Sequence, residues 1–161
     1  MKKLCLAALA AATLIGCSDN KEEESAAAES VRGVSDTEIK LGGMHDLSGV
    51  FAAFSSPAVQ VANDMFDEVN EAGGIHGRKI RYIVEDHAYQ VPKATQAVNK
   101  LVTRDEVFAM LMSLGTPHNL AAFPVMDSNN VPSILPLALS RPMETEGDFS
   151  HRFVFGPSYY E

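Results

Sequence analysis

The sequence contains no tryptophan and only two cysteines among its 161 residues. Cys5 and Cys17 both lie near the N-terminus, so no disulfide is available to hold the rest of the chain together, and the fold must depend on its apolar core. Basic residues are also scarce, because 13 Lys and Arg stand against 21 Asp and Glu and give a formal net charge of -8. This acidic balance argues against nucleic acid as a partner.

Long apolar runs and the usual catalytic motifs are missing as well. The apolar stretch from Leu4 to Ile15, interrupted only by Thr13, is shorter than the about 20 residues that a membrane-spanning helix needs. The chain has no G-x-S-x-G nucleophile motif, no Walker loop and no G-x-G-x-x-G motif. We therefore predict that the protein is not an enzyme and uses no cofactor.

The histidines show no spacing that is typical of a metal site. His45, His87, His118 and His151 form no H-x-x-x-H pair, and none of them is paired with a cysteine. We predict no metal site and interpret these histidines as scattered, solvated or capping residues. His87 and His118 lie near the expected ligand end of the sheet, so polar contact with a ligand is left as an alternative for these two.

The N-terminus has the pattern of a secretory signal. Lys2 and Lys3 precede the apolar stretch, and Leu14-Ile15-Gly16-Cys17 resembles a lipobox. We expect residues 1–16 to be a lipoprotein signal peptide and residues 17–38 to be a lipidated Cys17 followed by a flexible tether rich in Ser, Glu and Ala. The alternative is an ordinary secretory signal followed by a chance cysteine. Both readings place the mature protein in the periplasm or at the cell surface, and the first anchors it to a membrane by lipid.

From residue 39 onward, strand and helix patterns alternate with short connections. Such alternation predicts an α/β fold with a doubly wound, mostly parallel sheet. We expect a first helix capped by Ser55 or Ser56 with Pro57 in its first turn, a second helix over residues 91–105, and a third opened by Thr116-Pro117. The expected strands cover residues 39–44, 80–84, 107–112, 131–135 and 151–155.

One junction in this pattern also carries a resemblance. The run from Glu68 to Ile80 ends an amphipathic helix at Gly73-Gly74, either of which can adopt the left-handed conformation, and then enters a strand. Its A-G-G-I-x-G-R-K-I segment, together with the lipobox and the F-V-F-G-P-S segment at Phe153–Ser158, resembles the branched-chain amino acid type of periplasmic solute-binding proteins, of type I fold.

The resemblance implies that residues 39–161 are the N-terminal lobe of a two-lobed protein, cut at the crossover to a missing second lobe. It implies an extracytoplasmic solute-binding subunit of an ABC importer, which captures an amino acid, amide or organic acid between its lobes and meets permease and ATPase subunits. The alternatives are a ligand-sensing lipoprotein with the same fold and, with less support, an enzyme on a flavodoxin-like domain.

Ligands of open parallel sheets bind beyond the carboxyl ends of the strands. Gly115-Thr116 lies at such an end and opens a helix, so it is either an anion site or a simple helix cap. By resemblance, Thr116 and the backbone of Leu137 hold the ligand head group. The family has a hydroxyl near position 139, where this chain has leucine, and Ser140 replaces it if the register slips by one. Phe54 either covers the ligand or, with Phe51, packs the first helix on the sheet.

Overall fold

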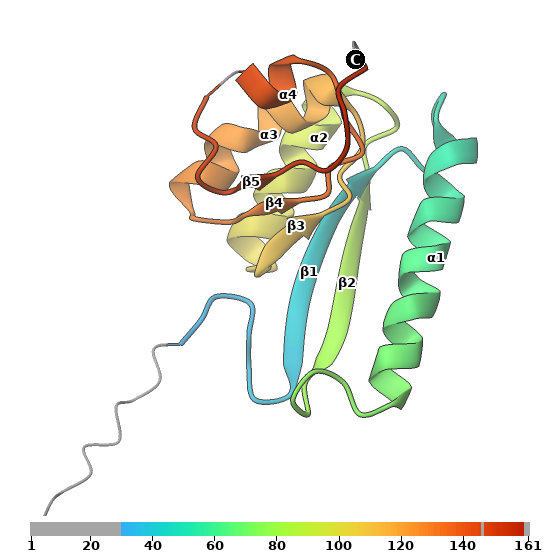
Figure 1. Ribbon diagram of the computed structural model, residues 1–161, viewed down its shortest axis with the longest axis vertical. Coiled ribbons are helices and arrows are strands. Elements are labelled where there is room, and N and C mark those ends of the chain that lie inside the picture. The colour runs from blue at the N-terminus through green and yellow to red at the C-terminus, as the bar shows by residue number, and fades with distance from the viewer. Residues whose placement is uncertain (1–29, 146, 160–161) are drawn as a thin grey trace, which may run out of the picture.

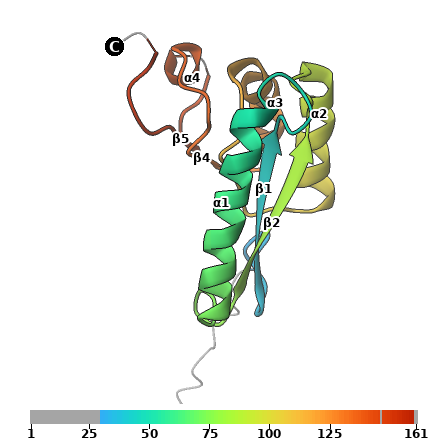
Figure 2. The same ribbon diagram turned by 90° about the vertical axis from the view of Figure 1, so that its right-hand side faces the viewer.

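The computed structural model describes residues 30–145 and 147–159. The predicted signal peptide, Cys17 and most of the predicted tether lie outside these residues. The described part forms three layers, with a parallel sheet between helices on its two faces (Figures 1 and 2).

The five strands of the sheet are all parallel and follow the order β2-β1-β3-β4-β5. Neighbouring β1 and β2 are long and pair from Glu38 with Lys79 to His45 with Asp86. The predicted α/β fold with a doubly wound parallel sheet is confirmed. The strands are β1 (Glu38–His45), β2 (Lys79–Asp86), β3 (Ala109–Leu111), β4 (Ser133–Ile134) and β5 (Arg152–Phe153).

The helices divide between the faces of the sheet. Helix α1 (Ala52–Glu71) covers one face over β1 and β2, whereas α2 (Val91–Asn99) and α3 (Thr116–Ser128) cover the other (Figure 2). Helix α2 continues into a π-helical turn, η1 (Lys100–Arg104), and a short helix, α4 (Pro142–Thr145), follows β4. The predicted second helix therefore changes its hydrogen-bond pattern at Lys100, and α4 was not predicted.

The apolar core lies between the sheet and the α2–α3 layer. Its buried side chains come from β1, α2, η1, β3, α3 and α4 and from the loops that precede β3 and flank β4. Burial of this kind explains why the short strand β3 is apolar throughout. The largest apolar members that are fully buried are Met44, Val98, Leu101, Val102, Val107, Met110, Met126, Val131 and Met143, and Phe123 is buried beside them.

The junction between α1 and β2 follows the predicted helix, turn and strand. The N–H of Gly74 donates to the carbonyl of Val69 and closes the helix with a positive φ of 74°. A Cβ on Gly74 would lie 2.1 Å from the carbonyl oxygen of Arg78, so only glycine fits there. The Asn70 side chain then bonds both the N–H and the carbonyl of Ile80, which ties the end of α1 to β2.

Two predicted boundaries differ from the structure. Helix α1 begins at Ala52, with no side-chain cap, so Pro57 lies inside the helix and Ser55 is buried against the sheet. The fold also begins before residue 39, because the Arg32 guanidinium donates to the carbonyl of Val102 at 2.8 and 3.0 Å. The end of the predicted tether is thus part of the folded domain.

The last strand is fastened to α3 through one side chain. Arg152, which begins β5, donates from Nη2 to a carboxylate oxygen of Asp127 at 2.8 Å. Its guanidinium also stacks on Phe123, 3.8 Å from the ring centroid, a favourable cation–π distance. Both partners belong to α3, so β5 and this helix form one packed unit.

Candidate functional site

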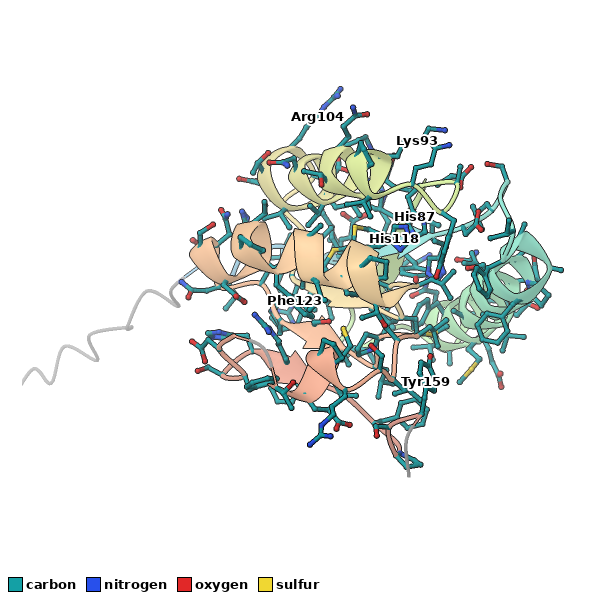
Figure 3. The ribbon with its side chains drawn as sticks, turned by 90° about the horizontal axis from the view of Figure 1, so that it is seen from above. His87, Lys93, Arg104, His118, Phe123 and Tyr159 are labelled. Atoms are coloured by element: carbon teal, nitrogen blue, oxygen red, sulfur yellow. The ribbon has the colours of Figure 1, made fainter. Side chains whose placement is uncertain are left out.

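A pocket of about 760 Å³ opens at the carboxyl ends of the strands, the edge that faces the viewer in Figure 3. It is bounded by the loops after β1 to β4 and by the segment after β5. This is the edge at which the sequence predicts a ligand site. The lining residues are Phe51, Phe54, Tyr89, Leu114, Gly115, Thr116, Pro117, Pro136, Leu137, Leu139, Phe155 and Tyr159.

The loop between β3 and α3 forms the rigid floor of this pocket. Leu114 and Leu137 form an isolated parallel bridge that extends the β3–β4 pairing beyond the strands. Helix α3 then begins at Thr116 with Gly115 as its N-cap residue, at φ 91°, and no side chain caps it. Thr116 is therefore not the cap itself. The first N–H groups of the helix have no partner within it and give this end a partial positive charge.

The Thr116 hydroxyl is held by a second hydroxyl. Ser140 donates to the Thr116 oxygen at 2.7 Å, which leaves the proton of Thr116 free to point toward another acceptor. Ser140 itself lies behind Thr116, and the side chain of Leu139 faces the pocket instead. The structure thus brings Gly115, Thr116 and Ser140 together, with only the first two in the pocket wall.

Leu137 lines the pocket, but its backbone is already used within the sheet edge. Its N–H donates to the carbonyl of Ser113 at 3.0 Å, and its carbonyl accepts the N–H of Gly115 at 3.2 Å. What remains of Leu137 for a ligand is the second lone pair of the carbonyl and the apolar side chain.

The aromatic wall comes from α1 and the loop that precedes it. Phe54 is 57% exposed and Phe51 is 44% exposed, and both line the pocket. Phe51 contacts Tyr89, with ring centroids 4.5 Å apart. Both rings line the pocket, and covering of a ligand by Phe54 stays a prediction.

Three histidines beneath this edge are fully buried, which corrects the interpretation of them as scattered or solvated. His45 contacts the Ser55 hydroxyl through Nδ1, at 3.2 Å, and the Tyr82 hydroxyl through Nε2, at 2.7 Å. Because Tyr82 donates its own proton to the carbonyl of Leu111, it accepts one from His45, whose ring is neutral with Nε2 protonated. Burial, with a smaller effect of the nearby His87, lowers the pKa of His45 to about 4.

The other two histidines are stacked face to face directly below the pocket. Their ring centroids are 4.3 Å apart, and Figure 3 shows His87 and His118 side by side. His87 accepts the N–H of Tyr89 at Nδ1 and donates from Nε2 to the carbonyl of Leu114. Burial lowers the pKa of His87 and of His118. No periodic pattern marks these residues in the sequence, so only their position after or before strand ends hinted at this cluster.

His118 is placed in the first turn of α3, under Gly115. Its ring is 1% exposed, and neither ring nitrogen has a well-formed hydrogen bond among the described residues. The carbonyl of Tyr89 lies close enough to oppose the lowering of its pKa, but burial prevails. A Cβ on Gly115 would lie 2.4 Å from the Nδ1 of His118, so the glycine is what lets the helix end and the ring lie this close together.

The two carboxylates near the pocket are already satisfied by the protein. Asp46 is fully buried and accepts the N–H groups of Gly49 and Phe51 at 2.6 and 2.7 Å. Asp86 accepts hydrogen bonds from Leu47, Ser48 and Ala88, at 2.5 to 2.9 Å. Burial opposes ionisation of Asp86, but these hydrogen bonds together outweigh it and lower its pKa. Both acids therefore organise loops.

The described ranges contain neither a cluster of metal-ligating side chains nor a helix suited to crossing a membrane. Within residues 30–145 and 147–159, no three His, Cys, Asp or Glu side chains come close enough together to hold a metal ion. No helix in the same ranges combines the length and the apolar character that crossing a bilayer requires.

Comparison with known proteins agrees with this geometry. The family model described as "Periplasmic binding protein" matches residues 38–161, which include the whole sheet and every loop of the pocket. The chain belongs to this family. The resemblance stated on the junction at residues 68–80, the lipobox and the segment Phe153–Ser158 is thereby confirmed.

Relatives within the family are considerably longer than this chain. An "amino acid binding protein" of Pseudomonas aeruginosa PAO1 is 30% identical over 124 residues, which are 77% of this chain and 32% of that protein. A fatty acid ABC transporter substrate-binding protein from Thermomonospora curvata shares 31% identity at a TM-score of 0.69, over 80% of this chain and 31% of the other. This periplasmic binding protein chain therefore spans about a third of the length of these relatives.

A third relative was solved with a ligand. The branched-chain amino acid transporter substrate-binding protein of Streptococcus pneumoniae, in complex with isoleucine, has a TM-score of 0.68 at 26% identity, over 76% of this chain and 34% of that chain. The three relatives are all named as binding proteins. This chain shares the family and the type I fold with these relatives, and it corresponds to one lobe of that fold.

Proposed function

We propose that this chain is the ligand-binding lobe of an extracytoplasmic solute-binding subunit of an ABC importer. The observation that carries the proposal is the apolar pocket at the carboxyl edge of the parallel sheet, whose floor is the uncapped N-terminus of α3. A small organic ligand, such as an amino acid, an amide or an organic acid, would bind there by its polar head group. The hydroxyl of Thr116 and the helix N–H groups would hold the head group, and Phe54 would cover it.

The remaining parts of the proposal concern the whole protein. Cys17 would carry the lipid that anchors the protein in the periplasm or at the cell surface, with residues before 30 as its tether. Permease and ATPase subunits would be its partners. Because the relatives extend well beyond the part that matches this chain, we propose that residues 39–161 form one lobe of a clamp that closes over the pocket by a hinge. The pocket is open at the carboxyl edge of the sheet, which supports closure of a second lobe over it.

Ligand binding to the full-length protein is tested by thermal unfolding with a panel of amino acids, amides and organic acids. A ligand at 100 times its Kd stabilises the folded state by about 2.7 kcal/mol, which raises Tm by several degrees. Thr116→Val should reduce this rise, because it removes the hydroxyl in the pocket floor.

Thr95→Val is the matched control, because the Thr95 hydroxyl bonds only to the carbonyl of Val91 on the exposed side of α2. It should leave the ligand-induced rise unchanged. If no member of the panel raises Tm, or if both variants reduce the rise equally, the proposed site is wrong. Uptake of the identified ligand is then measured in cells that lack the gene. Lost uptake indicates import, and unchanged uptake indicates sensing.

A further inference from the structure

We infer, on the basis of the function proposed above, that the ligand of this pocket is a monocarboxylate with an apolar, ring-bearing body, and that zwitterionic amino acids are disfavoured. The inference rests on three features of the described lobe: where a negative charge is stabilised, where a positive charge is not, and which side chains surround the body of the ligand.

A negative charge is stabilised at the pocket floor. The N–H of Gly115 is already donated to the carbonyl of Leu137, and Pro117 has no N–H. The N–H groups of Thr116 and His118, in the first turn of α3, are those without a partner inside the helix. Because Ser140 donates to the Thr116 oxygen, the hydroxyl proton of Thr116 is available to an acceptor in the pocket. The buried ring of His118 lies just under this floor, and neither of its nitrogens has a well-formed hydrogen bond among the described residues.

Among the described residues, the pocket offers no partner for a positive charge, because none of the described side chains that line it is charged. The nearest carboxylates belong to Asp46 and Asp86, and both accept hydrogen bonds from the loops that they organise. An ammonium group would therefore lose its hydration without gaining a counter-charge, next to the positive end of a helix dipole. An α-amino group on the ligand is thus a cost in this lobe.

The body of the ligand is surrounded by rings. Phe51, Phe54, Tyr89, Phe155 and Tyr159 contribute five aromatic side chains to one pocket. The volume of about 760 Å³ lies in the range of sites for drug-sized molecules, which bury most of their surface against apolar and aromatic walls. A planar ring that stacks offset or edge-on against these side chains gains contact that a short aliphatic chain does not.

The test uses four ligands that share one skeleton and differ in charge: 3-phenylpropanoate, phenylalanine, 3-phenylpropylamine and 3-phenylpropanamide. Isothermal titration calorimetry on the full-length protein should give a Kd for 3-phenylpropanoate at least tenfold lower than for phenylalanine, with no heat from the amine. Octanoate and 2-aminooctanoate form an aliphatic pair, for which the carboxylate should again bind more tightly.

A charge placed in the pocket should reverse this order. Leu139→Asp adds a carboxylate to the wall and should weaken 3-phenylpropanoate at least tenfold while the amine begins to bind. Leu135→Asp makes the same change at a side chain that is 38% exposed and lies outside the pocket, so it should alter each Kd less than twofold. Circular dichroism checks that each variant is folded, and the ligand series on the unmodified protein decides the inference alone if one is not.

The outcomes separate this inference from the proposed function. Phenylalanine binding as tightly as 3-phenylpropanoate would refute the carboxylate preference and leave a solute-binding function in place. Binding of the aliphatic carboxylate more tightly than the aromatic one would refute the ring-bearing body. Absence of heat from all six compounds would count against the inference and the proposed function together.

Discussion

Acid should destabilise the fold through His45, and the size of the effect follows from its surroundings. Its pKa falls from 6.5 to about 4 because the ring is buried. A pKa shift of one unit corresponds to about 1.4 kcal/mol. Protonating His45 in the folded state therefore costs about 3 kcal/mol more than protonating it in the unfolded state. That is a sizeable part of the 5 to 15 kcal/mol by which a domain of this kind is usually stable.

The direction follows from which state takes up the proton. The unfolded chain binds a proton at His45 below pH 6.5, whereas the folded chain binds it only near pH 4. The contribution of the neutral His45 to the free energy of unfolding is therefore complete above pH 6.5 and is lost as the pH falls toward 4. About 2 kcal/mol of it is lost between pH 7 and 4.5. The pKa values of His87 and His118 are also lowered, so they act in the same direction.

The assay is urea unfolding followed by circular dichroism at several pH values between 7.5 and 4.5. His45→Asn should lower stability at every pH because it breaks the bonds to Ser55 and Tyr82. More decisively, it should reduce the slope of the unfolding free energy against pH by up to about 1.4 kcal/mol per pH unit. His76→Asn is the matched control, because His76 is exposed in the turn after α1. Equal slopes for the unmodified chain and His45→Asn would refute the reasoning.

Two further predictions concern backbone positions. Gly115→Ala should destabilise the fold by about 3 kcal/mol in urea unfolding, because its Cβ would lie 2.4 Å from the Nδ1 of His118 at a φ of 91° that favours glycine. Asn70→Ala should lower the unfolding free energy by about 2 kcal/mol, because it leaves both the N–H and the carbonyl of Ile80 without their partner.

Each of these changes has a matched control. Gly73→Ala has the same kind of φ, 107°, but its Cβ would meet nothing within 4 Å, so it should cost only about 1 to 2 kcal/mol. Asn99→Ala removes one exposed bond, to the carbonyl of Thr95, and should cost less than about 1 kcal/mol. A glycine control as damaging as Gly115→Ala, or equal losses from the two asparagine changes, would contradict the assignments.

The order of strands and helices was predictable because it depends on local periodicity and turn residues. The glycines at 73 and 74 fix the end of α1, and apolar runs such as residues 107–112 mark buried strands. The start of α1 was missed because Asp46, not a serine, organises the loop before it by accepting the N–H groups of Gly49 and Phe51. A carboxylate that acts three and five residues ahead gives no helix-cap pattern in the sequence.

The candidate site divides in the same way. The position of Gly115 and Thr116 follows from the rule that parallel strands present their carboxyl ends together. The stacking of His87 on His118 depends on the loop after β2 meeting the first turn of α3, which is a long-range contact without a local pattern. The Thr116–Ser140 bond likewise joins two loops that only the completed sheet brings together.

The attachment of β5 to α3 through Arg152 has a mechanical consequence. The guanidinium of Arg152 bonds to Asp127 and stacks on Phe123, both in α3. The opposite end of α3 forms the floor of the pocket. The contacts of Arg152 and the pocket floor at Thr116 are therefore joined by one continuous helix rather than by a loop. A shift of β5 and a contact made at Thr116 would thus both act on α3, so we expect them to be coupled.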